Sequence, residues 1–359
     1  MAPMSRNKSK GHIPGEDVAA YYARRAEGDV GLIITEGTTI DHKASNGYPD
    51  VPSFHGKEAL AGWKKVVDLV HEKGGKIFPQ LWHVGSVRQS SSHHNQGVDN
   101  PDGTCCHEGR VPGYAPSKIP HPYVENGEVP HEMTEEDIQD VIDGFCRSAS
   151  YAKELGFDGL ELHGAHGYLI DQFFWKVTNK RSDRYGQDRT LFASELIRAV
   201  RKEVGEEFPI DFRLSQWKMG DYEAKMVRSP KELEAFLAPL VNAGVDLFHC
   251  STRRFWEPEF EGSYLNLAGW VKKITGKPVI TVGSVGLDVD FVTSLKGDSP
   301  CAQSPKNLEA LEKALESGDF DLVAVGRALL ADASWFQKVA QNRLDEITPF
   351  AKELLATLD

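Results

Sequence analysis

The sequence lacks the features that place a chain in a membrane or in a secreted, disulfide-bonded class. No apolar run in its 359 residues approaches the roughly 20 residues of a membrane span. The N-terminal stretch "MAPMSRNKSKG" contains no apolar segment of signal-peptide length. Only five cysteines occur, odd in number and scattered, which does not fit a secreted disulfide framework. We therefore expect a cytoplasmic protein in a reducing compartment.

A surplus of positive charge is also missing. The chain has 41 Lys and Arg against 53 Asp and Glu, a formal net charge of −12. This balance argues against a broad nucleic-acid-binding surface. A G-x-G-x-x-G motif that opens a helix after the first strand is absent as well, so a dinucleotide-binding Rossmann fold lacks its main support. We expect neither nucleic acid nor a membrane among the partners.

The sequence does contain a regular alternation of short apolar runs and amphipathic segments. Strand-like runs lie at 31–37, 76–85, 159–164, 210–215, 246–251, 278–284 and 322–327. Helical patterns lie near 58–73, 135–154, 190–204, 230–243, 263–275, 305–317 and 333–343. Apolar strands separated by helices are typical of a parallel sheet that is buried on both faces.

The number of strands favours a closed barrel. We interpret "MAPMS" at the N-terminus as the stub of an eighth strand, so that strand one is truncated at the N-terminus. Eight βα units without a break predict a (β/α)8 TIM barrel rather than a doubly wound sheet, although a sequence pattern alone does not prove closure. No domain boundary interrupts the rhythm, so residues 1–359 are expected to form a single domain.

One irregular segment, residues 86–134, follows the third strand in this count. It is rich in Ser, Gly, Pro and His and is longer than an ordinary loop. Loops that follow barrel strands lie at the C-terminal rim, so we expect this segment to form a lid over the active site. It contains a group whose spacing fits no standard zinc pattern, and for which a solvated loop is the better interpretation: His93, His94, Cys105, Cys106 and His107.

Polar and small residues at the ends of the last two strands indicate a phosphate site. Gly283 and Ser284 end the first of these strands in "VGSVG", and Gly326 and Arg327 end the second in "VGR". Small residues let backbone N–H groups approach an anion, and the arginine can pair with it. Barrels commonly hold a phosphate with the loops after strands seven and eight.

Two histidines follow one of the central strands, in "ELHGAHGYLIDQFF". His163 and His166 are three residues apart, and Tyr168 comes two residues further on. Three interpretations stay open: a metal site, which needs a third ligand, an acid–base pair, or two neutral hydrogen-bond donors beside a proton source. Gln80 and Arg213 lie at other strand ends and are also donors. Without a carboxylate pair, this set suits an electron-rich ring or a developing oxyanion.

Eight short motifs carry a resemblance to a known family. They are "MAPMSR", "ITEGT", "QLWHVG", "LHGAHGYLIDQFF", "NKRSDRYG", "DFRLS", "VITVGSVG" and "VAVGRALLADASW". In this order, across nearly the whole chain, they make the sequence similar to the old yellow enzyme family of flavoproteins. The resemblance implies a (β/α)8 barrel that binds FMN non-covalently and takes electrons from NADPH or NADH. It further implies hydride transfer to the β-carbon of an α,β-unsaturated carbonyl or a similar activated alkene.

The resemblance also implies roles for individual residues. His163 and His166 would hydrogen-bond the carbonyl oxygen of the substrate, and Tyr168 would protonate its α-carbon. Contacts with FMN are implied for Pro3, Met4, Ser5, Gly37, Gln80, Arg213, Gly283, Ser284, Gly326 and Arg327. Further wall residues of the pocket are expected at Tyr48, Trp82, Phe255 and Trp256.

Two other functions stay open beside this one. A phosphate-binding barrel isomerase or lyase needs a catalytic carboxylate or lysine at a strand end, for which Glu36 is the obvious candidate. A flavin-binding barrel without ene-reductase turnover is the second. In the leading hypothesis the partner is a small electrophilic alkene, and no metal takes part.

Overall fold

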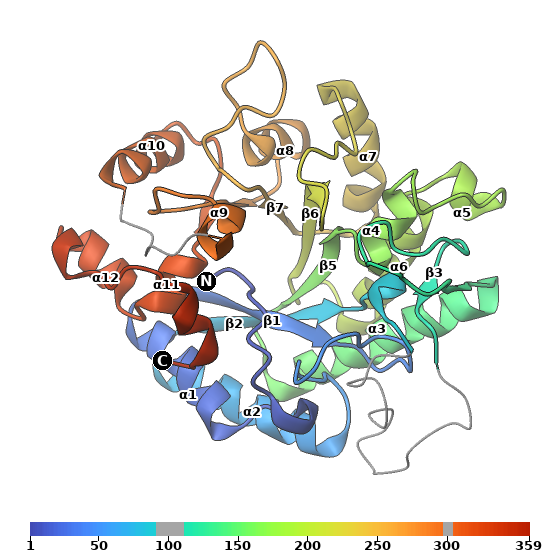
Figure 1. Ribbon diagram of the computed structural model, residues 1–359, viewed down its shortest axis with the longest axis horizontal. Helices are drawn as coiled ribbons and strands as arrows, with labels where there is room; N and C mark the ends of the chain where they lie inside the picture. Colours follow the sequence, from blue (N-terminus) through green and yellow to red (C-terminus); the bar gives the residue numbers. More distant parts are fainter. Residues whose placement is uncertain (91–110, 297–303) are drawn as a thin grey trace.

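Seven parallel strands form the centre of the molecule (Figure 1). The computed structural model describes residues 1–90, 111–296 and 304–359. The strands follow one another in a single sheet, in the order β1-β2-β5-β6-β7-β8-β9. Their bounds are β1 Leu32–Thr39, β2 Lys76–Trp82, β5 Leu160–His166, β6 Ile210–Lys218, β7 Leu247–Ser251, β8 Val279–Val282 and β9 Leu322–Ala324. Because all neighbouring pairs are parallel, the C-terminal ends of the strands meet at one edge of the sheet.

The N-terminal residues lie between the first and the last strand. The N–H of Ala2 donates to the carbonyl oxygen of Val325, which follows β9, at 2.9 Å. The N–H of Ile34 in β1 donates to the carbonyl oxygen of Met1 at 3.2 Å. The segment "MAPMS" therefore takes the place expected for an eighth strand, although it forms no regular strand itself. The predicted (β/α)8 barrel is confirmed.

Helices surround the ring of strands (Figure 1). The longer ones are α1 Glu16–Glu27, α2 Lys57–Glu72, α3 Glu135–Leu155, α6 Leu191–Val204, α7 Pro230–Ala243, α8 Leu267–Thr275 and α10 Pro305–Glu316. The short ones are α4 Leu169–Phe174, α5 Arg184–Gln187, α9 Phe291–Lys296, α11 Arg327–Ala331 and α12 Trp335–Ala340. Each helical pattern of the sequence is present, the last one only as α12, whereas α1 was not predicted. None of the helices in the described segments is both long and apolar enough to span a membrane.

Helix α3 shows how the sequence sets the ends of the helices. It begins after Thr134, whose hydroxyl accepts from the N–H of Asp137 while the Asp137 carboxylate accepts from the N–H of Thr134. This reciprocal capping satisfies N–H groups that have no partner within the helix. The helix ends at Gly156, which adopts the left-handed conformation with φ of 86°. The following strand β5 then returns through the barrel and carries the two histidines to the rim.

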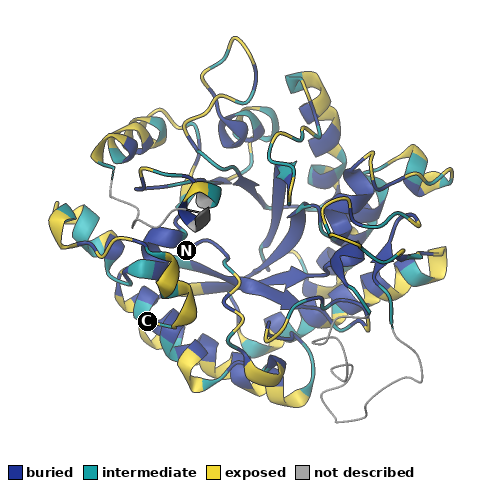
Figure 2. Cartoon of the chain, in the orientation of Figure 1, coloured by how far each residue is buried: buried dark blue, intermediate teal, exposed yellow. Residues whose placement is uncertain are grey.

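Burial follows the architecture (Figure 2). The strands are buried along almost their whole length, and the exposed residues lie mainly on the outward sides of the helices. Inside the ring, side chains from the strands and the N-terminal segment pack into one apolar layer: Ala2, Ile34, Phe78, Leu247, Ile280 and Ala324. This layer fills the barrel below the polar side chains at the strand ends, as in a packed barrel core.

The described part of the segment 86–134 lies beside the loop that carries Tyr168. It contains two short strands, β3 Tyr114–Ala115 and β4 His131–Glu132, which pair with each other. The imidazole Nε2 of His121 lies 3.2 Å from the carbonyl oxygen of Gly167. This placement fits the expected position at the rim, whereas closure as a lid stays a prediction. The group of His93, His94, Cys105, Cys106 and His107 lies outside the described residues.

Candidate active site

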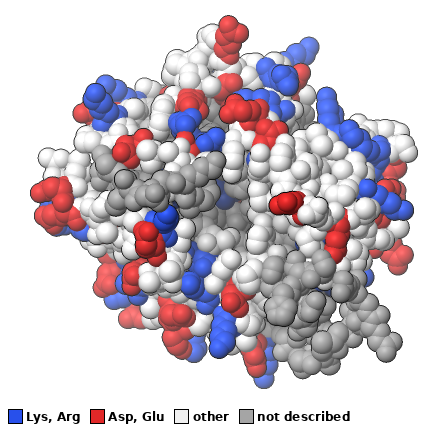
Figure 3. Space-filling view, in the orientation of Figure 1, with Lys and Arg blue, Asp and Glu red and all other residues white. Residues whose placement is uncertain are grey.

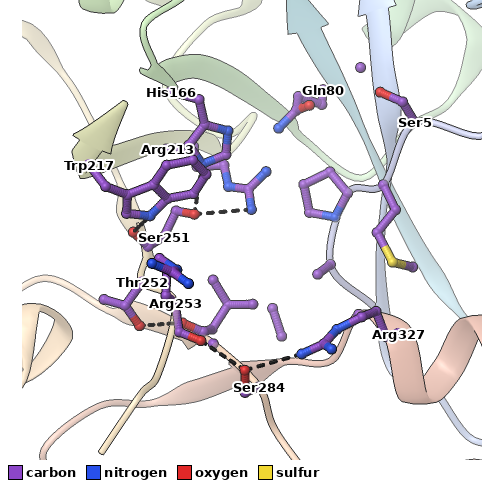
Figure 4. Close-up of a pocket in the computed structure, with 18 of the residues that line it drawn as sticks. Ser5, Gln80, His166, Arg213, Trp217, Ser251, Thr252, Arg253, Ser284 and Arg327 are labelled. Carbon is purple, nitrogen blue, oxygen red and sulfur yellow. Dashed lines mark hydrogen bonds between the residues drawn. The ribbon is translucent and has the colours of Figure 1, made fainter. Parts of the chain in front are cut away.

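A cavity of about 450 Å³ lies at the C-terminal ends of the strands (Figure 4). The catalytic and cofactor-binding residues predicted from the sequence all line it: Pro3, Met4, Ser5, Gly37, Gln80, His163, His166, Tyr168, Arg213, Gly283, Ser284, Gly326 and Arg327. Figure 3 shows acidic and basic side chains interspersed over the drawn face, with a hollow near its centre. Residues that are up to 324 positions apart in the chain, Pro3 and Arg327, thus meet in one space.

The loops after β8 and β9 form one end of this cavity. Gly283 has a φ of 147°, and a Cβ on it would lie 2.7 Å from the hydroxyl of Thr252, so only glycine fits there without strain. The guanidinium Nη2 of Arg327 donates to the Ser284 hydroxyl at 3.1 Å. A Cβ on Gly326 would meet only the Met4 sulfur at 3.4 Å and the Cβ of Ala2 at 3.9 Å, so the backbone there is open to a ligand. This end can hold an anion.

Arg213 lies toward the middle of the cavity, and Gln80 lies between His166 and Ser5, away from Ser284 and Arg327 (Figure 4). The Gln80 amide Nε2 donates to Glu161 Oε1 at 2.5 Å, which fixes the orientation of the amide. The Nη2 of Arg213 donates to the Ser251 hydroxyl at 3.5 Å, and its buried Nε has no hydrogen-bond partner among the described residues. A buried donor without a partner is costly, so this site is suited to a ligand that supplies an acceptor.

A buried polar cluster behind Gln80 and Arg213 was not predicted from the sequence. Glu161 accepts from His249, whose Nδ1 lies 2.6 Å from Glu161 Oε2, and Asp211 completes the cluster. Burial and the charge of Glu161 raise the pKa of Asp211 well above its usual range. Burial opposes ionisation of Glu161 as well, but His249 and Arg213 hold the pKa of its carboxyl below the usual value. The sequence signal that could have revealed this cluster is a polar residue inside each of three apolar strands: Glu161 in "GLELHG", Asp211 in "IDFRLS" and His249 in "DLFHCS".

His163, His166 and Tyr168 come together at the opposite end of the cavity. The ring of His163 lies 5.1 Å from the ring of His166 and 5.1 Å from that of Tyr168, measured between centroids. The three residues expected to act together are therefore neighbours in space. A third histidine, cysteine or carboxylate does not join the two histidines within the described segments, where the only such group is Glu161, Asp211 and His249. The geometry thus gives the metal-site interpretation no support.

The turn that carries Tyr168 is held by an ion pair that was not predicted. His166 has a φ of 66°, an uncommon conformation for a residue other than glycine. The N–H of Gly167 donates to Asp171 Oδ2 at 2.7 Å, and the Nζ of Lys218 lies 2.6 Å from Asp171 Oδ1. Both charged side chains are fully buried. Strained backbone at a functional site persists only where its surroundings fix it, and this pair is such a support.

The protonation states of these side chains follow from burial. Burial, together with the positive charge of Arg213, lowers the pKa of His163 to about 3. The same causes lower the pKa of His166 well below its usual range. Burial and the neighbouring Tyr48 raise the pKa of Tyr168 well above its usual value. At neutral pH the site therefore offers two uncharged imidazoles beside a phenol that keeps its proton, which is the third of the interpretations left open by the sequence.

Aromatic side chains form the wall around this end. Trp82 lines the cavity and packs edge-on against Tyr168 at 4.8 Å between ring centroids. Tyr48 was expected in the wall but does not line the cavity; it lies behind Tyr168, with its hydroxyl 3.0 Å from that of Tyr168. Trp217 was not predicted; its ring stacks on His166 at 4.1 Å. It follows "FRLSQ" on β6, and nothing in that local sequence indicated that it would turn toward β5.

Three residues considered in the sequence lie elsewhere. Phe255 and Trp256 do not line the cavity, so their assignment to its wall was wrong; Phe255 is buried and Trp256 is exposed. Glu36 is absent from the lining as well. Its carboxylate Oε2 accepts from the N–H of Arg6 at 2.8 Å, and burial raises its pKa to about 7. A role of Glu36 as a catalytic base at the cavity is therefore not supported.

Fold and site together define a (β/α)8 barrel with a cavity at its C-terminal rim, lined by three arginines and by no aspartate or glutamate among the described residues. The family model described as "NADH:flavin oxidoreductase / NADH oxidase family" matches residues 1–300. The chain belongs to this family, the old yellow enzyme family, as its motifs predicted. Its members are flavin-dependent oxidoreductases.

Individual relatives cover different shares of their own length. The chain is 33% identical over 360 residues to an NADH oxidase of Thermoanaerobacter brockii. The aligned region covers 97% of this chain but only 49% of the oxidase, so this chain spans about half the length of that relative. It is 36% identical over 245 residues to 12-oxophytodienoate reductase 2 of Arabidopsis thaliana, covering 67% of this chain and 63% of that protein. The structure is similar to that of morphinone reductase in complex with tetrahydroNAD, with a TM-score of 0.76, 25% identity, and coverage of 99% of this chain and 89% of that chain.

Proposed function

We propose that the protein is an FMN-dependent ene-reductase that takes electrons from NADH or NADPH and reduces the activated double bond of an α,β-unsaturated carbonyl compound. One observation carries this proposal. A single cavity unites an end suited to an anion at Arg327, the guanidinium of Arg213, whose Nε has no partner among the described residues, and uncharged histidines beside the protonated Tyr168. The names of the relatives, which include an NADH oxidase and an oxophytodienoate reductase, agree with this class of reaction.

The residues present fit FMN. Arg327, Ser284 and the open backbone at Gly326 suit its phosphate. Arg213 offers a positive charge to the electron-rich part of the ring system, and its buried Nε has no partner among the described residues; Gln80 offers its amide. When bound, FMN supplies the hydride, because redox chemistry of this kind belongs to the cofactor while the protein orients and polarises.

His163 and His166 are assigned the carbonyl oxygen of the substrate. An uncharged imidazole donates one hydrogen bond, and two such donors withdraw electron density from the carbonyl and stabilise the enolate oxygen that develops. His163 Nδ1 is buried and has no partner among the described residues, and the ring as a whole lines the cavity. His166 Nε2 lies 2.8 Å from the Ser251 hydroxyl, which helps to orient that ring.

Tyr168 is assigned the proton that the α-carbon receives. Its raised pKa keeps the phenol protonated at neutral pH, so that the proton is available when the enolate forms. The Tyr48 hydroxyl, 3.0 Å away, can donate a hydrogen bond to the phenolate oxygen that remains, until a proton from water restores the phenol. A positioned general acid of this kind is worth about 10²–10⁴-fold in rate.

Identification of the cofactor and of the product tests the proposal. The cofactor released by heating should have the mass of FMN. With NADH or NADPH in excess, the protein should convert 2-cyclohexenone to cyclohexanone. FAD, or no flavin after reconstitution, would contradict the assignment of the cofactor. Bound FMN without product would support a flavin-binding protein that lacks ene-reductase turnover.

A further inference from the structure

A third arginine, Arg253, lines the cavity and takes no part in the roles assigned to Arg213 and Arg327. Arg253 lies two residues after β7, and its side chain reaches the cavity between Thr252 and Ser284 (Figure 4). Its carbonyl oxygen accepts a hydrogen bond from the Ser284 hydroxyl at 2.9 Å. The same hydroxyl accepts from Arg327 at 3.1 Å. The Ser284 hydroxyl therefore joins the backbone of the loop that carries Arg253 to the guanidinium of Arg327.

The guanidinium of Arg253 is held in place from two sides. Its Nη2 donates to Asp290 Oδ1 at 2.7 Å, and its Cζ lies 4.5 Å from the centre of the Tyr222 ring. The Asp290 carboxylate is shared between two arginines, because its other oxygen, Oδ2, accepts from Arg254 Nη2 at 2.6 Å. Arg254 also reaches Glu257 at 2.9 Å, but on the exposed side of the loop, where an ion pair contributes little.

Two features of Arg253 and of the cavity around it favour an anionic ligand. Its Nε is buried and makes no hydrogen bond among the described residues. The described lining of the cavity includes Arg213, Arg253 and Arg327 but no aspartate or glutamate. Buried N–H groups are nearly always hydrogen-bonded, and a cluster of guanidinium groups in a cavity is suited to an anion.

We propose that Arg253 is a second guanidinium for the phosphate of the bound flavin and faces it from the side opposite Arg327. The proposal rests on the proposed function, since FMN must be the ligand. A phosphate monoester carries about −1.5 to −2 charges at neutral pH, which one arginine does not balance. Ser284, which binds the backbone carbonyl of Arg253 and the guanidinium of Arg327, links the two loops that would hold the phosphate.

The decisive experiment compares FMN with riboflavin, which differs from FMN only by lacking the phosphate. Dissociation constants of both flavins are measured by fluorescence quenching on the full-length protein after the bound flavin has been removed and the protein refolded. Arg253→Met removes the guanidinium but retains an unbranched side chain of similar length. Arg254→Met is the matched control. It removes the other guanidinium that binds Asp290, and Arg254 does not line the cavity.

We expect Arg253→Met to weaken FMN binding about 10- to 100-fold, the usual worth of a charge-assisted contact, and riboflavin binding less than about twofold. Arg327→Ala should show the same selective loss. Arg254→Met should leave the ratio of the two constants close to that of the parent protein.

Several results would overturn the proposal. Equal weakening of FMN and riboflavin by Arg253→Met would assign Arg253 a structural role. Dissociation constants for FMN and riboflavin that both equal those of the parent protein would remove Arg253 from the phosphate site. An unchanged ratio together with a higher KM for NADPH but not for NADH would place the anion on the reductant instead. If the parent protein binds neither flavin, the proposed function itself fails, and this result is distinct from all the others.

Discussion

At the scale of single residues, the proposed chemistry depends on burial, which keeps His163 and His166 uncharged while Tyr168 keeps its proton. A charged imidazolium pair would hold an enolate more strongly, but it would have to be desolvated together with Arg213 in the same cavity. Uncharged donors avoid this repulsion. The residue types were visible in the sequence, but their protonation states follow only from the burial and from the position of Arg213.

The first prediction concerns the two histidines. Replacement of both His163 and His166 by alanine should abolish the binding of phenols, because a phenolate oxygen resembles the enolate oxygen that these donors are assigned. Phenol binding is measured as the long-wavelength absorption band that appears on titration of the flavin-loaded protein. The Phe255→Leu variant, altered in a residue outside the cavity, is the control and should retain the band. An unchanged band in the double variant would remove the histidines from the site.

The second prediction concerns Tyr168. Tyr168→Phe should slow the reaction of the reduced protein with an enone by about 10²–10⁴-fold, because the general acid is lost. Reduction by NADH or NADPH needs no proton from this residue and should be nearly unchanged. The rate of reaction with nitroalkenes should be nearly unchanged as well, since their nitronate product is stable enough to leave the site and be protonated in water. Equal losses with all substrates would indicate that Tyr168 only packs against Trp82 and Tyr48.

At the scale of elements, the loops that follow the strands position the site. The strands themselves were predicted within a few residues, because apolar runs bounded by glycine and charged residues are a local signal. Helix α1 was overlooked, although Val18, Tyr21 and Tyr22 form its buried face. The short helices α4, α9 and α11 were not predicted either, since one or two turns carry too little periodicity to stand out.

The contacts that hold the site could not be predicted, because they join separate strands. The Lys218 side chain reaches Asp171 across 47 positions of the sequence, and Trp217 stacks on His166 across the neighbouring strand. Local patterns give no register between strands, so such pairs appear only when the barrel is assembled. The motif residues were found because their types and order, rather than their contacts, identify the family.

The third prediction tests the support of the Tyr168 turn. Asp171→Ala would leave Lys218 as a buried charge without its partner, and we expect a loss of about 3–5 kcal/mol in the free energy of unfolding. Denaturant titration measures this loss. The double variant Asp171→Leu with Lys218→Met removes both charges and should recover most of the stability. A single variant as stable as the parent would show that the ion pair does not hold the turn.

The fourth prediction concerns the loop after β8. Gly283→Ala would force a side chain into a φ of 147° and within 2.9 Å of the backbone nitrogen of Arg254. We expect weaker FMN binding and a loss of about 1–3 kcal/mol in the free energy of unfolding. Gly74→Ala is the control, since Gly74 also has a positive φ but has open space around its Cβ position. Flavin affinity should be unchanged in the control. An equal loss of flavin affinity in Gly283→Ala and Gly74→Ala would contradict the role of the loop after β8.

At the scale of the whole molecule, the barrel brings residues from both ends of the chain to one cavity. Residues 2–5 and 324–330 both contribute to the lining, so the site requires the complete ring of strands. The interpretation of residues 1–359 as a single domain stays a prediction.

The fifth prediction concerns acid stability. Burial lowers the pKa of His163 to about 3 and that of His42 to about 4, whereas an unfolded chain has a histidine pKa of about 6.5. At pH values between about 3 and about 6.5, the unfolded state therefore binds more protons than the folded state. The free energy of unfolding should be highest above about pH 6.5 and should fall as the pH drops toward about 3. In urea titrations across this range, His163→Gln should show a shallower fall; a slope equal to that of the parent would contradict the assigned shift.

The central claim is that one cavity carries electrons from a nicotinamide to an activated alkene, and separate measurement of the two half-reactions tests it most directly. The purified protein is mixed without oxygen with one equivalent of NADH or NADPH, and then with 2-cyclohexenone, while flavin absorbance is recorded. The account predicts loss of the yellow colour in the first step, its return in the second, and one equivalent of cyclohexanone. A protein that is bleached but not reoxidised by the enone, or that is not bleached at all, would contradict it.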